Sequence, residues 1–228
     1  MDIPSKGLFI TFEGGEGSGK STQIGLLEDE FKTLFPQTDI VVTREPGGSP
    51  GAELIRCLLT TGDPDRWFPF SEFLLFYAAR YDHWKRTISP TLRQGGIVIC
   101  DRYIDSSRIY QGIGRGIPES FFREMHQMWS ESSPERSFWP DITFAFSMDP
   151  HKGLKRSRQR QKDQEQKEDR FEREPESFHR KINQAYRELA RKESRVHLIE
   201  ADNTIEAVHQ EIVEKVLKFL AGKSEETL

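Results

Sequence analysis

The sequence predicts an α/β fold built on a five-stranded, mostly parallel sheet flanked by helices. Five short β-rich runs are bounded by glycine or charged residues, at positions 7–13, 40–44, 96–101, 141–148 and 196–200. Longer stretches with helical character separate these runs, which is typical of βαβ units and of a sheet covered on both faces. Clusters of glycine and charge follow the runs directly, where ligands bind in folds of this class.

Length and composition favour one domain over residues 1–228. A chain of 228 residues can bury one sizeable core. The formal net charge of −4 argues against a general nucleic-acid binder, whose domain is normally basic. No run approaches about 18 apolar residues, and the N-terminal segment lacks a signal-peptide pattern. We therefore expect no membrane span, no nucleic-acid partner and a cytoplasmic protein.

The two cysteines, Cys57 and Cys100, each stand in an apolar context, IRCLL and IVICDRY. Two cysteines placed in this way suit neither a disulfide framework nor a zinc site. We expect both side chains to be buried thiols.

The first β-rich run leads into a loop with the pattern G-x-x-x-x-G-K-[ST] and then into a helical stretch. In such a loop the backbone N–H groups face the phosphates, Lys20 neutralises the β and γ oxygens, and Ser21 binds magnesium. The motif in this context predicts the P-loop NTPase fold with an ATP site. The residues of that predicted site are Gly14, Gly15, Glu16, Gly17, Ser18, Gly19, Lys20, Ser21 and Thr22.

The second and third runs end on charged residues at what should be the same edge of the sheet. Asp101 lies where a second acidic group would hold magnesium, although an aspartate at a strand end also serves turn chemistry. Arg44 and Arg102 lie near the expected position of a substrate phosphate, and a planar guanidinium binds two phosphate oxygens at once. Salt bridges with Glu45 or Asp101 are the alternative for these arginines.

The segment FLLFYAAR, residues 73–80, predicts a helix that carries part of a base site. Phe76 and Arg80 are four residues apart, so the ring and the guanidinium share one helix face. A flat ring can stack on a nucleobase while the arginine donates to a base carbonyl, and a buried guanidinium needs a partner. For Phe73, Leu74 and Leu75 we expect core packing, which is also the alternative for Phe76.

Phosphate loops serve several classes of protein, so the loop alone leaves the function open. A GTPase switch needs a guanine-reading segment of the N-K-x-D type, which the sequence lacks. An ATPase motor usually needs a longer chain and an arginine from a neighbouring subunit.

Five segments together resemble the thymidylate kinase family: FEGGEGSGKST, TREPGG, LLFYAAR, DRYIDSSRIYQG and DRFE. They stand in the family's order from about residue 8 to residue 172. The resemblance implies a homodimeric nucleoside monophosphate kinase that transfers the γ-phosphoryl group of ATP to dTMP, with Mg²⁺ as cofactor. Ile109 departs from the pattern, because the family usually has a small alanine at this position.

The resemblance implies roles for single residues around the acceptor phosphate and sugar. Arg44 and Arg102 grip the acceptor monophosphate, and we expect Arg102 to be catalytic together with Lys20. Glu16 matches the acidic residue that meets the 3′-hydroxyl of the deoxyribose. Tyr110 matches the residue that crowds the 2′ position and so disfavours a ribonucleotide.

Further matches surround the base. Phe76 matches the base-stacking position of the family, and Arg80 shares its helix face. Ser107 matches the position that hydrogen-bonds thymine, and Ser106 and Gln111 are expected to assist.

The stretch 151–174 is crowded with charged residues, which by itself predicts a solvated surface. The family has two patterns, one with an arginine in the phosphate loop and one with glycine there and arginines in a mobile lid. Gly17 implies the second pattern, and Arg156, Arg160 and Arg170 match lid positions. Lid cations, with Arg156 and Arg160 as the catalytic candidates, would stabilise charge on the transferring phosphoryl group.

The C-terminal stretch 205–220 predicts a docking helix, because one face carries Val208, Ile212, Val216, Phe219 and Leu220. We expect residues 222–228 to form a disordered tail.

Two other functions stay open at this point. Another nucleoside monophosphate kinase or a deoxynucleoside kinase would share the ATP site, although paired Arg44 and Arg102 favour an acceptor phosphate over a hydroxyl. A regulator that binds nucleotide without turnover is the second alternative. Intact Lys20, Asp101 and Arg102 count against it.

Overall fold

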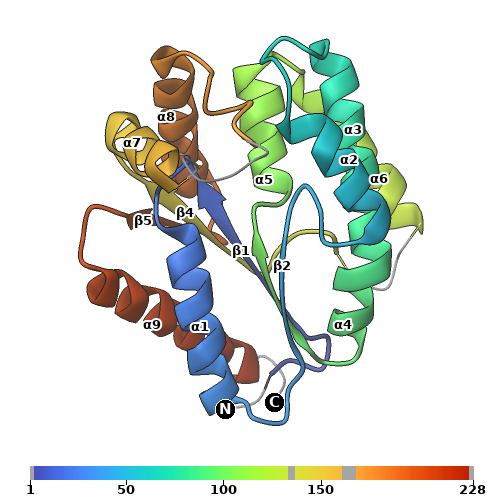
Figure 1. The fold of residues 1–228 in the computed structure, drawn as a ribbon. Helices are drawn as coiled ribbons and strands as arrows, with labels where there is room; N and C mark the ends of the chain where they lie inside the picture. Colours follow the sequence, from blue (N-terminus) through green and yellow to red (C-terminus); the bar gives the residue numbers. More distant parts are fainter. Residues whose placement is uncertain (1–2, 133–136, 161–167, 226–228) are drawn as a thin grey trace.

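The computed structural model describes residues 3–132, 137–160 and 168–225, and Figure 1 shows a central sheet with helices packed around it. The strands are β1 (Leu8–Gly14), β2 (Ile40–Arg44), β3 (Ile97–Asp101), β4 (Ile142–Ser147) and β5 (Val196–Glu200). The α-helices in the described ranges are α1 (Lys20–Leu34), α2 (Pro50–Thr60), α3 (Pro69–His83), α4 (Ser89–Arg93), α5 (Ile104–Ser107), α6 (Glu119–Ser132), α7 (Pro150–Arg160), α8 (Glu176–Lys192) and α9 (Ile205–Glu225). Two π-helical turns extend α3 and α5, namely η1 (Trp84–Ile88) and η2 (Arg108–Gly114).

The strands of the described sheet pair in the order β2-β3-β1-β4-β5, and every pair is parallel. The predicted five-stranded α/β sheet is confirmed. In the register, Asp101 of β3 is opposite both Phe12 of β1 and Arg44 of β2. The carboxyl ends of these three strands therefore meet at one edge, which brings the segments after Gly14, Arg44 and Asp101 side by side.

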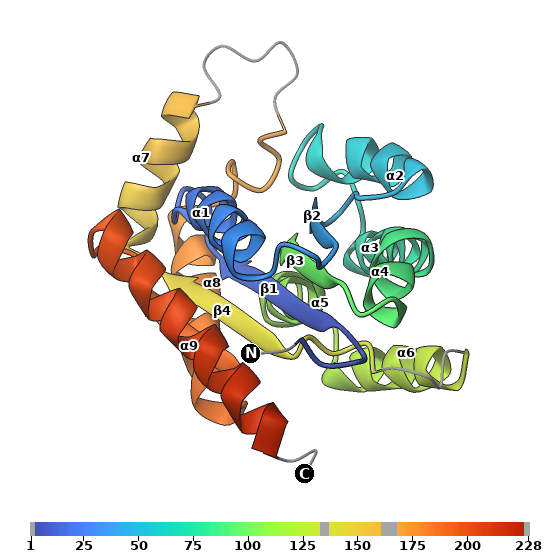
Figure 2. The same ribbon diagram turned by 90° about the horizontal axis from the view of Figure 1, so that it is seen from below.

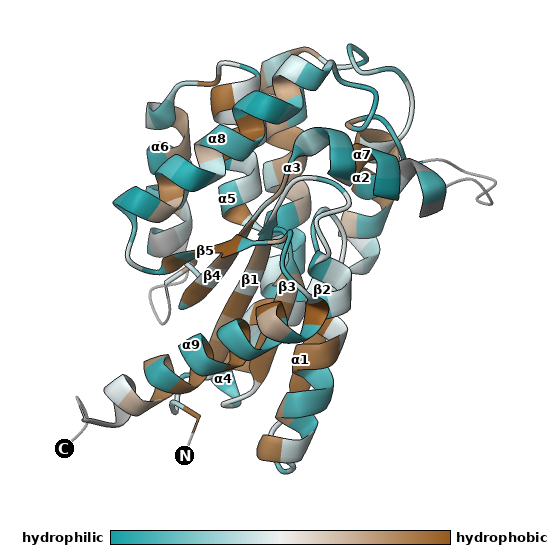
Figure 3. Ribbon diagram, turned by 90° about the vertical axis from the view of Figure 1, so that its left-hand side faces the viewer, coloured by the Kyte–Doolittle hydropathy of each residue, from teal (hydrophilic) through white to brown (hydrophobic). Residues whose placement is uncertain are grey.

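Successive strand residues face two separate cores. Leu8, Ile10 and Phe12 of β1 pack with α1 and α9 on one face of the sheet. Phe9, between them in sequence, packs on the other face with aromatic side chains of α3 and α6. Figure 3 shows hydrophobic colouring concentrated in the central strands, and Figure 2 shows α9 and α6 on opposite sides of the sheet. Packing on both faces of the sheet fixes the edge at which the carboxyl ends of β1, β2 and β3 meet.

Two burial predictions were wrong. Cys100 is buried in β3 as expected, but Cys57 is exposed, because α2 turns Ala52 and Leu59 inward and Cys57 away from them. Leu74 is 45% exposed, because α3 buries Phe73 and leaves the next residue outside.

The C-terminal helix is longer than predicted. It begins at Ile205 as expected, but it continues past Gly222 to Glu225, into the stretch expected to be disordered. A glycine costs a helix interior only about 1 kcal/mol, so it need not end the helix. Residues 226–228 lie outside the described ranges. Within those ranges, no helix is long and apolar enough to span a bilayer.

Candidate active site

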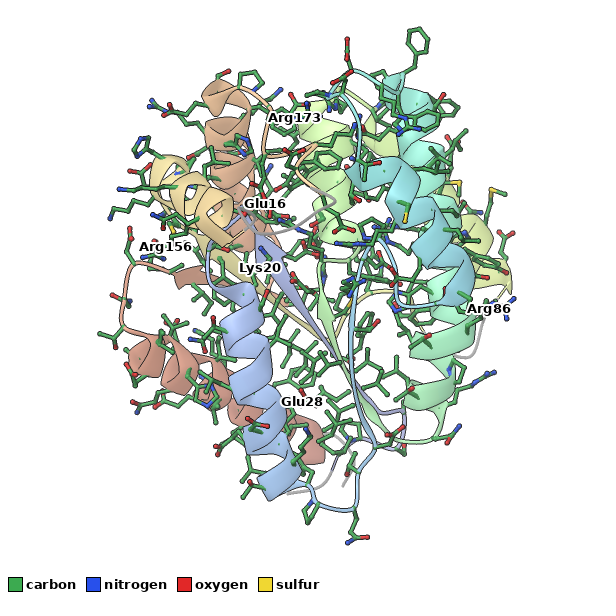
Figure 4. All side chains as sticks on the ribbon, in the orientation of Figure 1. Glu16, Lys20, Glu28, Arg86, Arg156 and Arg173 are labelled. Atoms are coloured by element: carbon green, nitrogen blue, oxygen red, sulfur yellow. The ribbon has the colours of Figure 1, made fainter. Side chains whose placement is uncertain are left out.

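A cleft of about 710 Å³ opens at the carboxyl edge of the sheet. Most of the predicted site residues line it: Glu16, Gly17, Ser18, Gly19, Lys20, Ser21, Arg44, Phe76, Arg80, Asp101, Arg102, Ser106, Tyr110 and Gln111. Gly14, Gly15, Thr22, Ser107 and Arg156 are not part of the lining, although Ser107 contacts Arg80 directly. Figure 4 shows Glu16 and Lys20 where β1 passes into α1, with Glu28 farther along α1.

The phosphate loop joins β1 to α1 and has the backbone that its glycines allow. Gly17 and Gly19 adopt φ angles of 66° and 92°, in the left-handed region that favours glycine. Lys20 Nζ donates to the carbonyl oxygens of Gly15 at 2.9 Å and Gly14 at 3.3 Å. Burial, and then the nearby Arg102, lower the pKa of Lys20. The ammonium group lies under the loop, where phosphates would rest on the backbone N–H groups.

Helix α7 packs directly on the phosphate loop. A Cβ atom built on Gly17 would collide with the carbonyl oxygen of Gly153, and one on Gly153 would collide with the carbonyl oxygen of Glu16. The two backbones can approach in this way because neither residue has a side chain. An arginine at position 17 is therefore incompatible with α7 in this place.

Asp101 and Ser21 fit a magnesium ion that arrives with phosphates. Asp101 Oδ1 is buried, and no hydrogen-bond donor among the described residues reaches it. Ser21 lines the same cleft from the first turn of α1. Over the described ranges, no cluster of three or more His, Cys, Asp or Glu residues could hold a metal by itself. Magnesium usually binds through one or two protein groups plus substrate phosphates, which matches this sparse set.

Arg102 is held against the wall of the cleft. Its φ of 65° lies in the left-handed region, where strain persists only if the surroundings impose it. Nη2 donates to Glu16 Oε1 at 2.6 Å and Nη1 donates to Ser106 Oγ at 3.3 Å. The guanidinium also lies 5.2 Å from the ring centroid of Tyr110. Arg102 thus pairs with Glu16 rather than with Glu45 or Asp101.

Arg44 differs from Arg102 in its exposure. Its side chain is 54% exposed and forms an ion pair with Glu53 on α2, with 3.1 Å between Nη2 and Oε2. The expected alternative, a salt bridge with Glu45, is not found, because Glu45 is buried against α3. Arg44 can therefore turn toward an anion in the cleft at little cost.

Arg80 lies at the floor of the cleft and is 1% exposed. Nε donates to Glu45 Oε2 at 2.6 Å, and Nη2 donates to Ser107 Oγ at 2.9 Å and to the carbonyl oxygen of Tyr103 at 3.1 Å. Glu45 also contacts His83 Nδ1 at 3.1 Å. Nη1 is buried, and no acceptor in the described part of the chain reaches it. This nitrogen is available to a carbonyl group of a ligand.

Aromatic side chains form the wall above Arg80. The ring centroids of Phe76 and Phe171 are 6.0 Å apart, and Tyr110 meets Phe171 edge-on at 5.7 Å. Gln111 Nε2 donates to Glu72 Oε1 at 2.9 Å. Ile109 is buried in a cluster with α8, so its larger side chain is accommodated in the core. The cleft therefore offers a flat apolar slot with a polar floor, which suits a base.

The charged stretch divides into two parts. Arg156 on α7 is exposed, and its Nη1 donates to Met148 Sδ at 3.6 Å. The side chain of Arg160 and residues 161–167 lie outside the described structure. Arg170, expected in the mobile lid, is fully buried and paired with Glu72. Arg170 is therefore not a free lid cation. The segment around it, which the sequence predicts to be solvated, instead folds back onto α2 and α3.

Sequence reasoning missed Glu13. It ends the apolar run of β1, where it accepts hydrogen bonds from the backbone N–H of Tyr103 at 2.8 Å, Ser106 Oγ at 2.5 Å and Tyr186 Oη at 3.1 Å. Burial and the charge of Asp105 raise the pKa of Glu13 to about 7. An acidic residue inside an otherwise apolar strand was the available signal.

Glu45 and Glu72 were missed as site residues for a different reason. Their partners Arg80 and Arg170 are 35 and 98 residues away along the chain. Only the folded arrangement shows that they orient site residues.

Comparisons with known proteins agree with this geometry. A family model described as thymidylate kinase matches residues 12–212. The chain is 43% identical over 215 residues to the thymidylate kinase of Ruegeria pomeroyi, covering 94% of this chain and 96% of that protein. It is 42% identical over 217 residues to the enzyme of the same name from Caulobacter vibrioides, covering 95% and 99%.

A solved structure is also similar. The crystal structure of thymidylate kinase from Ehrlichia chaffeensis superposes with a TM-score of 0.70 at 33% sequence identity, covering 93% of this chain and 98% of that one. The likeness therefore extends over nearly the whole chain. The chain belongs to the thymidylate kinase family.

Proposed function

We propose that this member of the family transfers the γ-phosphoryl group of ATP to dTMP in the cleft, giving ADP and dTDP. Family membership assigns dTMP as the acceptor. The observation that carries the assignment to this cleft is Arg80, a buried guanidinium with one nitrogen left for a ligand, which lines the same cleft as the phosphate loop. The donor phosphates would thus bind at the phosphate loop and the acceptor base at Arg80, in adjoining parts of one cleft.

On the donor side, the phosphate loop binds the β- and γ-phosphates of ATP. Its backbone N–H groups and the N-terminus of α1 supply partial positive charge, and Lys20 adds a full charge from below. These groups are fixed before the reaction, so they stabilise charge on the transferring group without reorganisation.

Mg²⁺ is part of the proposal, with Ser21 and Asp101 as the residues that would hold it. When bound, the ion neutralises charge on the β- and γ-phosphate oxygens. Asp101 is suited to this position because its buried Oδ1 is oriented by β3 and lacks a donor within the described ranges.

On the acceptor side, Phe76 stacks on thymine while Arg80 and Ser107 hydrogen-bond its edge. Arg102 and Arg44 bind the acceptor phosphate, with Ser106 and Gln111 as further polar contacts. Glu16 meets the 3′-hydroxyl, and Tyr110 crowds the 2′ position. The acceptor phosphate is ionised at neutral pH, so in-line attack on the γ-phosphorus needs positioning more than a general base.

The lid is proposed to span residues 151–174 of this single domain. Arg156, and Arg160 with it, would bring positive charge to the phosphoryl group when α7 shifts toward the cleft. Gly17 supports this role, because its contact with Gly153 excludes an arginine from the phosphate loop. Arg156 now rests against Met148, at the end of β4 beside the loop.

The central experiment measures ADP release from the purified protein with Mg-ATP and a panel of nucleoside monophosphates. We expect rapid ADP release with dTMP and much slower release with dCMP, dGMP, dAMP and the ribonucleotide UMP. No dTMP-dependent ADP release would contradict the proposed function.

A homodimer is proposed to form through the apolar surface of α2 and α3. Leu54 and Leu58 on α2 are 74% and 40% exposed, and Leu74 on α3 is 45% exposed. Beside them, the exposed Phe70 ring lies 5.2 Å from Phe121 of α6. Helices α2 and α3 pack against each other, and exposed apolar side chains gathered on neighbouring helices are typical of an interface. In sedimentation velocity we expect a dimer, and a monomer for the Leu54→Glu/Leu58→Glu variant; an unchanged sedimentation coefficient would exclude this surface.

We also propose a cytoplasmic location. The two cysteines are both free thiols, which suits a reducing compartment. Fractionation of cells that express the protein at its native level, with antibody detection, would test this.

A further inference from the structure

Arg170 is used entirely inside the protein. Its guanidinium donates from Nε to the carbonyl oxygen of Asp63 at 3.0 Å, from Nη1 to that of Leu59 at 3.2 Å and from Nη2 to that of Pro64 at 2.8 Å. Nη2 also donates to Glu72 Oε2, and the side chains of Arg170 and Glu72 are 0% and 1% exposed. The planar fork of arginine thereby fills a socket made by the connection between α2 and α3.

Glu72 connects this socket to the acceptor pocket. Its Oε1 accepts from Gln111 Nε2 at 2.9 Å and lies 3.6 Å from Arg115 Nε. Glu72 also stands in the first turn of α3, one turn before Phe76. One buried carboxylate thus contacts the wall of the acceptor pocket and the segment 168–174, which we call the return segment.

The two residues after Arg170 reach the two sides of the cleft. Phe171 lies against Phe76 and Tyr110 and lines the cleft. Glu172 Oε1 accepts from Ser157 Oγ on α7 at 2.6 Å, next to Arg156 in sequence. Arg170 therefore directly precedes one residue that lines the cleft and one that contacts α7.

We infer that Arg170 and Glu72 are a positioning pair that anchors the return segment, so that Phe171 closes the acceptor pocket and Glu172 holds α7. This inference rests on the proposed acceptor site. A buried ion pair adds little net stability compared with apolar packing, but it fixes one geometry. The pair acts through Phe171 and Glu172 and does not touch the reacting atoms.

The test compares Arg170→Gln with Arg173→Gln on the same return segment. Arg173 also contacts the α2–α3 connection, through Gly62 and Asp63, but its side chain is 43% exposed. For Arg170→Gln we expect the KM for dTMP to rise about tenfold and kcat to fall about tenfold, with the KM for ATP within twofold of the parent. Arg173→Gln should leave all three constants within twofold.

The conservative variant Arg170→Lys separates charge from geometry. Lysine keeps the charge but cannot donate in the directions of the guanidinium fork, so it should restore less than half of the loss. The inference would be overturned if Arg170→Lys had the kinetic constants of the parent, or if Arg170→Gln left kcat and the KM for dTMP unchanged. An equal rise in both KM values would also overturn it.

Hydrogen exchange gives a readout independent of turnover. In the parent, saturating dTMP should slow amide exchange in residues 168–174, and Arg170→Gln should exchange faster there and lose the response to dTMP. If Arg170→Gln does not fold, Glu72→Gln/Arg170→Gln removes both buried charges and receives the same measurements. Unchanged exchange in the folded variant overturns the inference, whereas a parent inactive with dTMP contradicts the proposed function instead.

Discussion

The proposed donor and acceptor halves of the cleft are built by different means. The phosphate loop is mainly backbone: its glycines set the curve, and Lys20 donates to two carbonyl groups of the same loop. The acceptor half is made of side chains that form buried ion pairs across elements, such as Arg80 with Glu45. Substitutions on the donor side should therefore remove chemistry while sparing the fold, and substitutions on the acceptor side should affect both.

The largest effect is expected for Lys20→Ala. We expect turnover with dTMP to fall on the order of 10³-fold, because a preorganised charge at the transferring phosphates is lost. The melting temperature should move little, because the described hydrogen bonds of Lys20 are to backbone carbonyls alone. Steady-state ADP release and circular dichroism melting measure the two quantities. If Lys20→Ala loses activity only because it unfolds, donor-side substitutions do not spare the fold and the comparison is wrong.

Arg80→Ala should damage binding and fold together. We expect the KM for dTMP to rise about 100-fold with ATP binding nearly unchanged, because Arg80 is assigned to the base. Glu45 would be left buried without its cation, which destabilises a protein by about 3–5 kcal/mol. Urea unfolding measures the loss, and Glu45→Gln/Arg80→Gln serves as the charge-neutral control. If Arg80→Ala weakens ATP and dTMP equally, the division into halves is wrong.

Arg156→Ala should resemble a donor-side substitution. We expect turnover to fall more than tenfold with nucleotide affinities little changed, since the lid cation would act mainly in the transition state. The melting temperature should stay within about 2 °C, because the side chain is exposed. Single-turnover phosphoryl transfer by Arg156→Ala, Arg160→Ala and the double variant is the measurement. If the double variant transfers phosphoryl at the rate of the parent, Arg156 and Arg160 have no catalytic role and are ordinary solvated surface residues.

The remaining prediction concerns stability alone, at Glu13, which lies between the two halves. Its pKa is raised from 4.5 to about 7, so the folded state holds this proton more tightly than the unfolded chain. The associated stability is complete below pH 4.5 and is lost as the pH rises through 7. Arginine neighbours lower the pKa of Asp105, so Asp105 titrates below this window.

Glu13→Gln removes this titration. Between pH 5 and pH 8, a pKa raised from 4.5 to about 7 loses about 2–3 kcal/mol of stability. We therefore expect the melting temperature of the parent to fall relative to that of the variant by about 5–10 °C. Calorimetry at both pH values measures the difference, in which the histidine titrations shared by the two proteins cancel. A difference between parent and variant that is the same at pH 5 and pH 8 would show that Glu13 is ionised at both pH values.

The same contrast explains what the sequence could predict. Local sequence signals predict the strands and the phosphate loop, because periodicity, glycine spacing and Lys20 can each be seen within a short segment. The predicted fold is confirmed. The acceptor residues were found through motifs, and the roles given to them stay predictions. The partners of Arg80 and Arg170 could not be predicted, because 35 and 98 residues separate each arginine from its carboxylate. The burial of Cys57 and Leu74 was predicted wrongly, because the sequence alone does not show whether an apolar residue of a helix lies on its inner or its outer face.

The contact between Gly17 and Gly153 also limits how this sequence can evolve. Each glycine leaves room for the backbone that carries the other, so a side chain at either position separates α7 from the phosphate loop. Moving the proposed lid cation into the loop would thus require change at both sites, because an arginine at position 17 collides with Gly153. The two positions should therefore vary together among descendants of this chain, and an enzyme engineered to carry a loop arginine must first be given a displaced α7.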